Sequence, residues 1–243
     1  MKILVVGASG ATGRLLVEEL LNRGQKVRII VRSDESLSDS VKNHYNLEII
    51  KASLLDLCDN EMQKYVEGID AIASCLGHNI TVKGMFGQPR KLVTDAAIRL
   101  CEAVKENKHK KKVKYVLMNT AGNVNRDINE PISFGQKVVV GIIRLLLPPH
   151  SDNENAADYL RTEFGQNDDI IEWSVVRPDG LINEDEVTGY KVYSSPIRDT
   201  IFNAGKTSRI NVGHFMAELI TDSKIWNKWR GQMPVIYNKE ISE

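Results

Sequence analysis

The sequence has no long apolar run, and this absence excludes membrane-spanning helices. No stretch approaches the ~20 apolar residues that such a helix needs. The longest candidate, 138–147, is interrupted by Gly141 and Arg144. The apolar run at the N-terminus is too short for a secretory signal peptide, and Gly-Ala-Ser-Gly follows it. We therefore expect a cytoplasmic protein without a membrane span.

Net charge is also absent: 32 Lys and Arg residues balance 32 Asp and Glu residues, which argues against a nucleic-acid-binding role. The one lysine-rich run, 105–114, fits a solvated segment at a helix C-terminus. The three cysteines, Cys58, Cys75 and Cys101, are widely spaced and form no C-x-x-C motif. They predict reduced thiols, and no metal site is predicted.

What the chain does contain begins at residues 3–6 (ILVV), a β-branched run that predicts a buried strand. Gly7, Gly10 and Gly13 follow at three-residue spacing and open a helical pattern. This order is typical of a dinucleotide-binding fold: the glycines permit a sharp turn, close approach of the pyrophosphate and tight helix packing. The residues of this turn that are predicted to bind the cofactor are Gly7, Ser9, Gly10, Ala11, Thr12, Gly13 and Arg14.

Further strands alternate with helices along the chain. Apolar patterns predict strands at 26–31, 47–51, 69–74, 113–118 and 170–176, and helices at 61–67 and 89–106. Such alternation predicts an α/β fold, a Rossmann-like doubly wound parallel sheet that binds its ligand at the carboxyl ends of the strands. With 243 residues, the chain fits one domain, 1–243, with elements of a small C-terminal substrate lobe drawn from about 179–243.

The last third is less regular. Helices are predicted at 135–147 and 152–165, joined at Pro148-Pro149, with a strand of the substrate lobe at 189–194, a helix at 212–221 and a late strand at 233–237. Helix 135–147 is too apolar to be freely exposed. We favour a packed wall over the nicotinamide; the alternative is a partner or dimer surface, so the protein is a monomer or a homodimer.

The residues after the second strand bear on the choice of cofactor. NAD-preferring folds place an Asp or Glu there to bind the ribose hydroxyls. Here Arg32 and Ser33 follow Val31, and a guanidinium matches a 2′-phosphate. Arg14 could flank the same phosphate, whereas Asp34 comes slightly late for the acidic role. The pattern predicts that NADP(H) is preferred over NAD(H).

Several short segments of the sequence resemble those of a known family. GASGATG at 7–13 resembles the short-chain dehydrogenase/reductase superfamily, in its extended and atypical branches. WSVVRP at 173–178, SRINVGHFM at 208–216 and NAADYL at 155–160 are similar to segments of the NmrA-like and flavin-reductase-like atypical branch. The departures are Asn211 and Gly213, where that branch usually has Asp and Ala. The resemblance implies a Rossmann-like NAD(P)-binding fold.

The same resemblance implies further cofactor contacts. Ser53 stands where the family usually has an adenine-binding aspartate, so only the adenine wall carries over. Cys75 is interpreted as a packed small residue rather than a redox thiol. The added cofactor residues are Ser53, Leu54, Cys75, Leu76, Gly77, Asn119, Thr120 and Pro178.

The catalytic Y-x-x-x-K of standard members is missing. At its place the chain has His150 in the tyrosine position and Glu154 in the lysine position. A histidine can serve as a general acid near neutral pH, but a glutamate cannot act as a cationic ribose clamp. Thr120 keeps a hydroxyl beside the nicotinamide. Alternatively, His150 is a loop residue and Thr120 only positions backbone.

The sequence is compatible with three functions. The first is an NADPH-dependent reductase of a planar or carbonyl acceptor such as a flavin or quinone, with a small-molecule substrate bound beside Thr120 and His150. The second is a non-catalytic NAD(P)-binding redox sensor of the NmrA-like type, which the missing tyrosine and lysine favour. The third is an epimerase- or dehydratase-like enzyme, which usually needs the missing pair.

Overall fold

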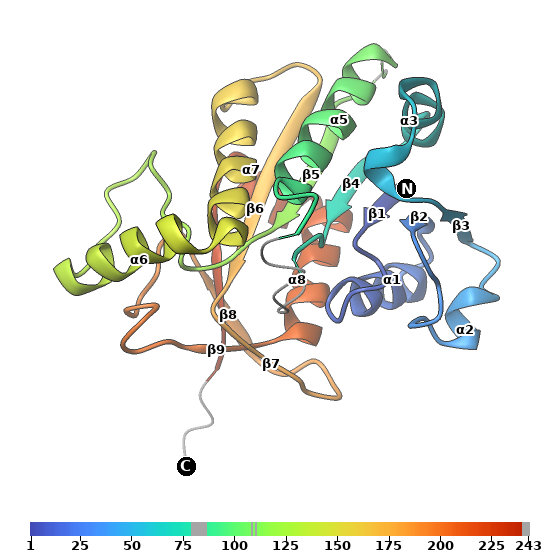
Figure 1. Cartoon of the computed structure of the whole chain (residues 1–243). Coiled ribbons are helices and arrows are strands. Elements are labelled where there is room, and N and C mark those ends of the chain that lie inside the picture. The colour runs from blue at the N-terminus through green and yellow to red at the C-terminus, as the bar shows by residue number, and fades with distance from the viewer. Residues whose placement is uncertain (79–86, 108, 110, 240–243) are drawn as a thin grey trace.

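The predicted strands assemble into one eight-stranded sheet of order β3-β2-β1-β4-β5-β6-β10-β8 (Figure 1). The computed structural model describes residues 1–78, 87–107, 109 and 111–239. Neighbouring strands are parallel except β10 and β8. The bounds are β1 (Lys2–Val6), β2 (Lys26–Val31), β3 (Leu47–Lys51), β4 (Ala71–Ser74), β5 (Val113–Met118), β6 (Ile171–Pro178), β8 (Tyr190–Tyr193) and β10 (Val235–Asn238). The doubly wound α/β class is confirmed.

Helices cover both faces of the sheet and form a hydrophobic core on each. Side chains of β1 alternate between these two cores. Leu4 and Val6 pack with α3 (Asp59–Val66), α5 (Leu92–Glu106) and α7 (Pro148–Phe164). Ile3 and Val5 pack on the other face, with α1 (Gly13–Asn22), α2 (Asp39–Lys42), α8 (Arg209–Thr221) and α9 (Ser223–Trp229). A fully buried parallel strand therefore has apolar residues on both faces, as the run ILVV indicates.

The last third departs from the expectation in two places. The predicted strand at 189–194 exists as β8, but it forms the antiparallel edge of the main sheet. The separate element at this end is a short ribbon of β7 (Gly180–Ile182) and β9 (Lys206–Ser208). The Pro148-Pro149 pair is the first turn of α7 rather than a joint, since proline lacks only an N–H that the first turn leaves unpaired.

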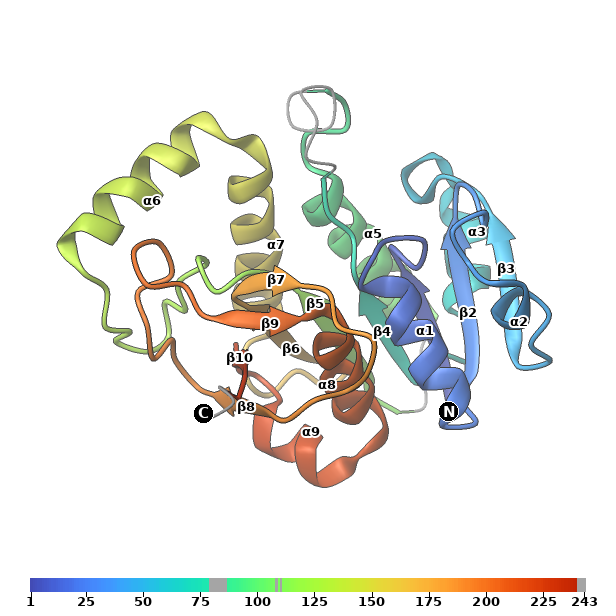
Figure 2. The same cartoon turned by 90° about the horizontal axis from the view of Figure 1, so that it is seen from below.

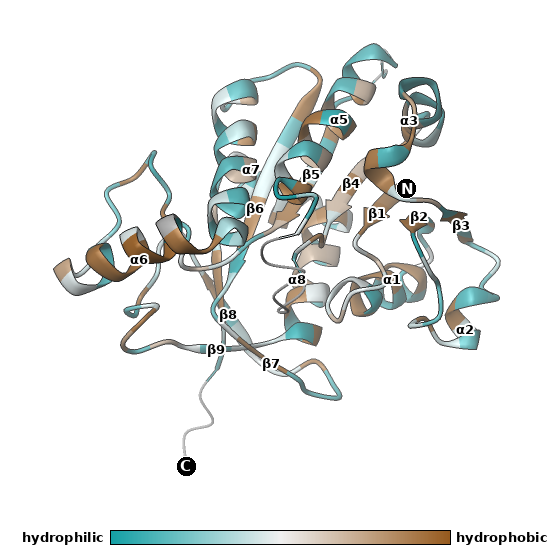
Figure 3. Ribbon diagram, in the orientation of Figure 1, coloured by the Kyte–Doolittle hydropathy of each residue, from teal (hydrophilic) through white to brown (hydrophobic). Residues whose placement is uncertain are grey.

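Helix α6 (Phe134–Leu146) corrects the favoured interpretation of a packed wall. It projects from the body beside α7 and carries a strongly apolar surface (Figures 2 and 3). Phe134, Val138, Ile142 and Leu146 recur at every fourth position and are 84%, 46%, 51% and 60% exposed. A four-residue repeat places them on one side of the helix, so this row has no covering element among the described residues.

Both departures from the family pattern have structural reasons. The amide of Asn211 donates to Asn238 Oδ1 at 2.8 Å and to Thr188 Oγ1 at 2.9 Å, which an ionised aspartate could not do. A Cβ on Gly213 would lie 3.1 Å from the backbone nitrogen of Leu16, so glycine lets α8 approach α1 closely. No described helix is long and apolar enough to cross a membrane.

A buried ion pair holds the loop after β5 against β6. The guanidinium of Arg177 donates to both carboxylate oxygens of Glu130, at 2.6 and 3.1 Å, and both side chains are almost fully buried. Arg177 also donates to the carbonyl oxygens of Asn123 and Met233. The backbone N–H of Asn125 donates to Glu130 Oε2. Arg177, the arginine of the family-like segment WSVVRP, therefore has a structural role.

Glu130→Gln should lower the free energy of unfolding by about 3 to 5 kcal/mol, because it leaves the Arg177 charge buried without its counterion. Urea denaturation measures the loss. The matched control is Glu163→Gln, which breaks the exposed pair with Lys105 and should cost less than about 1 kcal/mol. Equal, small losses in the two variants would contradict the structural role of the pair.

Candidate cofactor-binding and active site

The glycine turn between β1 and α1 leaves no room for side chains. Gly7 has a φ of 74°, and a Cβ there would lie 2.4 Å from the carbonyl carbon of Cys75. A Cβ on Gly13 would lie 2.1 Å from the carbonyl oxygen of Gly7. The backbone N–H of Gly10 donates to that same oxygen at 3.0 Å. Glycine is thus required at Gly7 and Gly13 by sterics alone.

The N-terminus of α1 has the character of an anion site. Thr12, at the N-cap, makes no side-chain bond to the helix, and the first turn has no acidic residue. The N–H of Arg14 donates to the carbonyl oxygen of Gly10 at 3.0 Å. The other N–H groups of the first turn and the positive end of the helix dipole suit a negatively charged ligand. The turn beside it is the point where the sheet order reverses, between β1 and β4, the usual ligand position in such sheets.

The other predicted cofactor residues lie along the same edge, because parallel strands end on one side of a sheet (Figure 1). The side chain of Ser53 makes no capping hydrogen bond to the short 3-10 turn (Leu54–Asp56) that it precedes. By chain position, the residues at this edge are Arg32 and Ser33 after β2, Ser53 and Leu54 after β3, Cys75, Leu76 and Gly77 after β4, Asn119 and Thr120 after β5, and Pro178 at the end of β6.

At the β2 end of this edge, two cations are free and one carboxylate is engaged. Arg14 and Arg32 are exposed and make no side-chain hydrogen bond or ion pair among the described residues. Asp34 Oδ1 lies 2.9 Å from Lys51 Nζ. The hydrogen bond from Lys51 is the main cause that lowers the pKa of Asp34 below its ordinary value.

At the β5 end, the structure brings together the two predicted catalytic residues. A Cβ on Gly122 would lie 3.6 Å from His150 Cε1 and 3.8 Å from Thr120 Oγ1, so both side chains flank this glycine. The N–H of Gly122 donates to Thr120 Oγ1 at 3.3 Å. Asn119 fixes this segment to α7 by donating from Nδ2 to the carbonyl oxygen of Asn153 at 2.8 Å.

Glu154 lies behind His150 and is buried. Its carboxylate accepts two hydrogen bonds from Arg144 of α6, at 2.6 and 2.7 Å. His150 Nε2 lies 3.4 Å from Glu154 Oε1, close enough for an ion pair although the angle is poor for a hydrogen bond. Burial favours a raised pKa for Glu154, but the contacts with His150 and Arg144 outweigh it and lower the pKa to about 2.

A second buried carboxylate was missed from the sequence. Asp152 of α7 accepts from the backbone N–H groups of Val93 and Thr94, at 2.8 and 3.0 Å, and so caps α5 from a neighbouring helix. His78, directly after Gly77, bonds Asp152 Oδ2 at 2.8 Å. The pair ties the segment after β4 to α7. No local motif marks it, since capping residues normally precede their own helix.

Cys75 is a packing residue, as expected. Its Sγ lies 3.9 Å from Met216 Sδ, and burial raises the pKa of the thiol to about 12. The residue is partly exposed, but a thiol with so high a pKa is not a thiolate at neutral pH. No cluster of three or more His, Cys, Asp or Glu side chains suited to a metal occurs in the described part of the chain.

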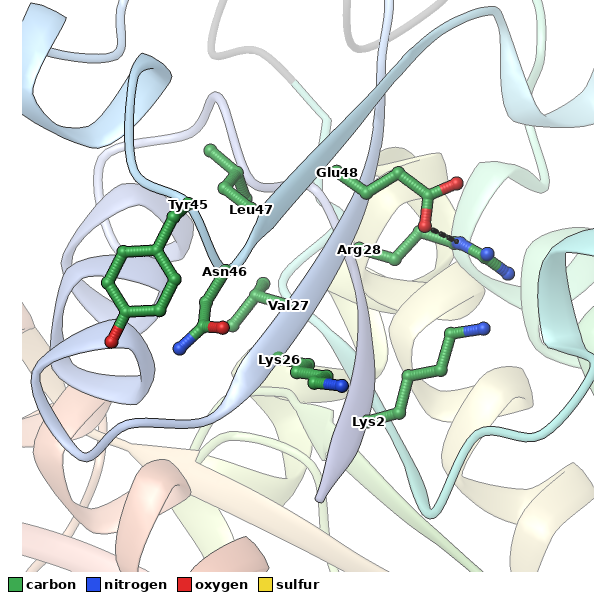
Figure 4. A pocket seen from close by; sticks show the side chains of 8 residues that line it. All are labelled: Lys2, Lys26, Val27, Arg28, Tyr45, Asn46, Leu47 and Glu48. Atoms are coloured by element: carbon green, nitrogen blue, oxygen red, sulfur yellow. Dashed lines mark hydrogen bonds and ion pairs between the residues drawn. The ribbon is translucent and has the colours of Figure 1, made fainter.

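One surface pocket lies away from this edge. It has a volume of about 270 Å³ and lies at the amino ends of β1 and β2 and the start of β3, on the opposite edge of the sheet (Figure 4). Its lining is Lys2, Lys26, Val27, Arg28, Tyr45, Asn46, Leu47 and Glu48. None of the residues predicted to bind the cofactor lines it.

Fold and site together define a Rossmann-type dinucleotide-binding protein. The chain belongs to the NAD(P)H-binding family, whose model matches residues 7–223. An uncharacterised chloroplastic protein of Arabidopsis thaliana is 36% identical over 76 residues, which span 31% of this chain and 23% of the plant protein. The location of the present chain stays a prediction.

Solved structures support the same fold. An oxidoreductase of Lactococcus lactis has a TM-score of 0.68 at 19% identity, with 98% of this chain and 91% of that chain covered. A short-chain dehydrogenase/reductase of Veillonella parvula in complex with NADP gives 0.69 at 13% identity, covering 98% and 95%. A candidate NADH-flavin reductase of Streptococcus pneumoniae gives 0.65 at 19%, covering 98% and 100%. These structures confirm the Rossmann-like fold that the resemblance implied, and the family match confirms an NAD(P)H-binding domain.

Gly13→Ala should abolish binding of NADPH, because the new Cβ would collide with the carbonyl of Gly7. Quenching of tryptophan fluorescence measures binding, and far-UV circular dichroism checks folding. Gly141→Ala, on exposed α6 with no atom within 4 Å of its Cβ, is the control and should bind normally. Gly10→Ala meets a milder contact, 3.2 Å, and should fold with weakened binding. Normal binding by Gly13→Ala would refute the steric account.

The low pKa of Glu154 predicts a pH-dependent stability. Its folded pKa lies below the unfolded value of about 4.3, so it stabilises the fold above that pH and loses this effect as the pH falls towards 2. Because solvent reaches Arg144, we expect on the order of 2 to 3 kcal/mol. Urea unfolding at pH 6 and pH 3 should show a smaller loss for Glu154→Gln than for the wild type, whereas Glu163→Gln should follow the wild type. Parallel pH curves would contradict this.

Proposed function

We propose that the protein is an NADPH-dependent reductase of a planar or carbonyl small-molecule acceptor such as a flavin or quinone. The observation that carries this proposal is the convergence of Thr120 and His150 beside Gly122, at the carboxyl end of β5. A dinucleotide held by the glycine turn would extend along this edge towards them. They are the polar groups that we assign to the reacting end.

The residues present fit a dinucleotide. The turn at Gly7–Gly13 and the uncapped start of α1 supply N–H donors for a pyrophosphate, and the edge beyond β4 supplies Leu76 and Gly77. When bound, the cofactor supplies a hydride from its nicotinamide. We infer a preference for NADP(H) over NAD(H) because Arg14 and Arg32 are free for a 2′-phosphate while the Asp34 carboxylate is occupied by Lys51.

His150 and Thr120 divide the remaining work. His150 donates a proton to the oxygen of a carbonyl acceptor, and its Nε2 is held towards the Glu154 carboxylate. The hydroxyl of Thr120 orients the same oxygen. A planar acceptor can take its proton from solvent and then needs neither side chain as a proton donor. The missing tyrosine therefore does not exclude reduction. Glu154 replaces the usual lysine as a positioning residue for His150, with no role in binding the ribose.

A second candidate function has its own support. A non-catalytic NAD(P) sensor would need a surface for a partner protein, and the exposed row on α6 is such a surface. Arg144 links α6 directly to Glu154 beside the reacting end. Occupancy of the site could therefore bias α6 through one ion pair.

Oxidation of NADPH with a panel of flavins, quinones and aldehydes tests the first function. Turnover with at least one acceptor is expected, and His150→Gln should lower kcat for a carbonyl acceptor ~10²-fold or more without changing the Kd of NADPH. His44→Gln, a histidine stacked on Tyr45 far from this edge, is the control. Binding without turnover across the panel would refute the reductase and favour the sensor.

A further inference from the structure

We propose that Lys51 determines cofactor specificity: it withholds the Asp34 carboxylate from a ribose 2′-hydroxyl and adds a cation for a ribose 2′-phosphate. The proposal rests on the proposed binding of a dinucleotide but not on turnover. It concerns a residue of β3 that lies outside the glycine turn and outside the segment after β2 that normally decides between the two cofactors.

Strand pairing places Lys51 at the correct edge. It is the last residue of β3 and pairs with Val31, the last residue of β2. The backbone N–H of Ala52 donates to the carbonyl oxygen of Val31 at 2.9 Å, so the two strands stay together to their ends. Neighbouring strands are about 4.8 Å apart, so a lysine at this position reaches across to the segment that follows β2.

The contact with Asp34 is well defined. Lys51 Nζ lies 2.9 Å from Asp34 Oδ1, and the Asp34 side chain is 20% exposed while Lys51 is 63% exposed. The lysine thus reaches from solvent onto a mostly covered carboxylate. This hydrogen bond is the main cause that lowers the pKa of Asp34 below its ordinary value. Lys42 also attracts it but is itself bonded to Asp39 at 2.8 Å.

The segment that carries Asp34 is fastened to the glycine turn. Ser36 Oγ donates to the carbonyl oxygen of Ser9 at 2.9 Å, and the side chain of Leu37 is buried. The N–H of Leu37 donates to the carbonyl oxygen of Asp34 at 3.0 Å and closes a turn. Asp34 is therefore held at the adenosine end of the site, although it comes two residues after Arg32. Freed from Lys51, its carboxylate would be available to a ribose hydroxyl.

Loss of the Lys51 charge should change the affinities for the two cofactors in opposite directions. A 2′-phosphate carries roughly two negative charges at neutral pH, as phosphate monoesters do. With Lys51 in place, this end of the edge carries the cations of Arg14, Arg32 and Lys51, and the carboxylate of Asp34 is neutralised by Lys51. Without it, a free Asp34 repels the phosphate of NADPH but accepts a hydrogen bond from the hydroxyl of NADH. Loss of general attraction alone would weaken both cofactors.

The test is a double-mutant cycle read out as Kd for NADPH and for NADH by isothermal titration calorimetry. Lys51→Gln should weaken NADPH about 5- to 10-fold and tighten NADH severalfold, the size of roughly one ion pair or hydrogen bond. Asp34→Asn in the Lys51→Gln background should remove the gain for NADH. Lys26→Gln is the control: it removes the same charge from the opposite end of β2 and should leave the NADPH to NADH ratio unchanged (Figure 4).

Equal weakening of both cofactors, an unchanged ratio, or a gain for NADH that survives Asp34→Asn would each overturn the proposal. Lys51 is exposed, and a thermal unfolding curve shows whether each variant keeps the wild-type fold. These outcomes can be distinguished from the outcomes that test the proposed function. A shifted ratio without any turnover would support the role of Lys51 and refute the reductase, whereas turnover with an unchanged ratio would do the reverse.

Discussion

The close approach of three backbone segments at the start of α1 is the constraint on which the rest of the site depends. Gly7 touches the end of β4, and Gly13 touches Gly7, at distances that no Cβ could occupy. Because β1 is a central strand, this contact fixes α1, β4 and the reversal of strand order relative to one another. The anion-binding end of α1 is then directed along the edge where the other strands end.

Buried charges organise the opposite end of the same edge. Arg177 with Glu130 and Asp152 with the start of α5 are each removed from solvent and fully bonded, which is the condition under which a buried charge is tolerated. Arg177 holds the loop after β5, and Asp152 holds both the start of α5 and, through His78, the segment after β4. Together they fix the segments after β4 and β5, and His150 and Thr120 both lie beside Gly122 in the second of these segments.

Much of the fold follows from patterns within short windows. The ends of β2, β3 and β5 agree with the predicted strands, because apolar β-branched runs bounded by turn residues have few alternatives. Helix α6 and strand β8 were placed less well. Their sequence patterns specify a helix and a strand, but whether a face is covered and which sheet a strand joins depend on distant parts of the chain.

The sequence by itself determined the family, the glycine turn and the edge at which the site lies, since sterics and periodicity act over a few residues. It also indicated that the usual tyrosine and lysine are missing. Only the tertiary structure decided which side chains meet: Glu154 with Arg144, His78 with Asp152, and Asp34 with Lys51. Such pairs join residues on different elements, so strand register and helix packing determine them, and no local pattern records them.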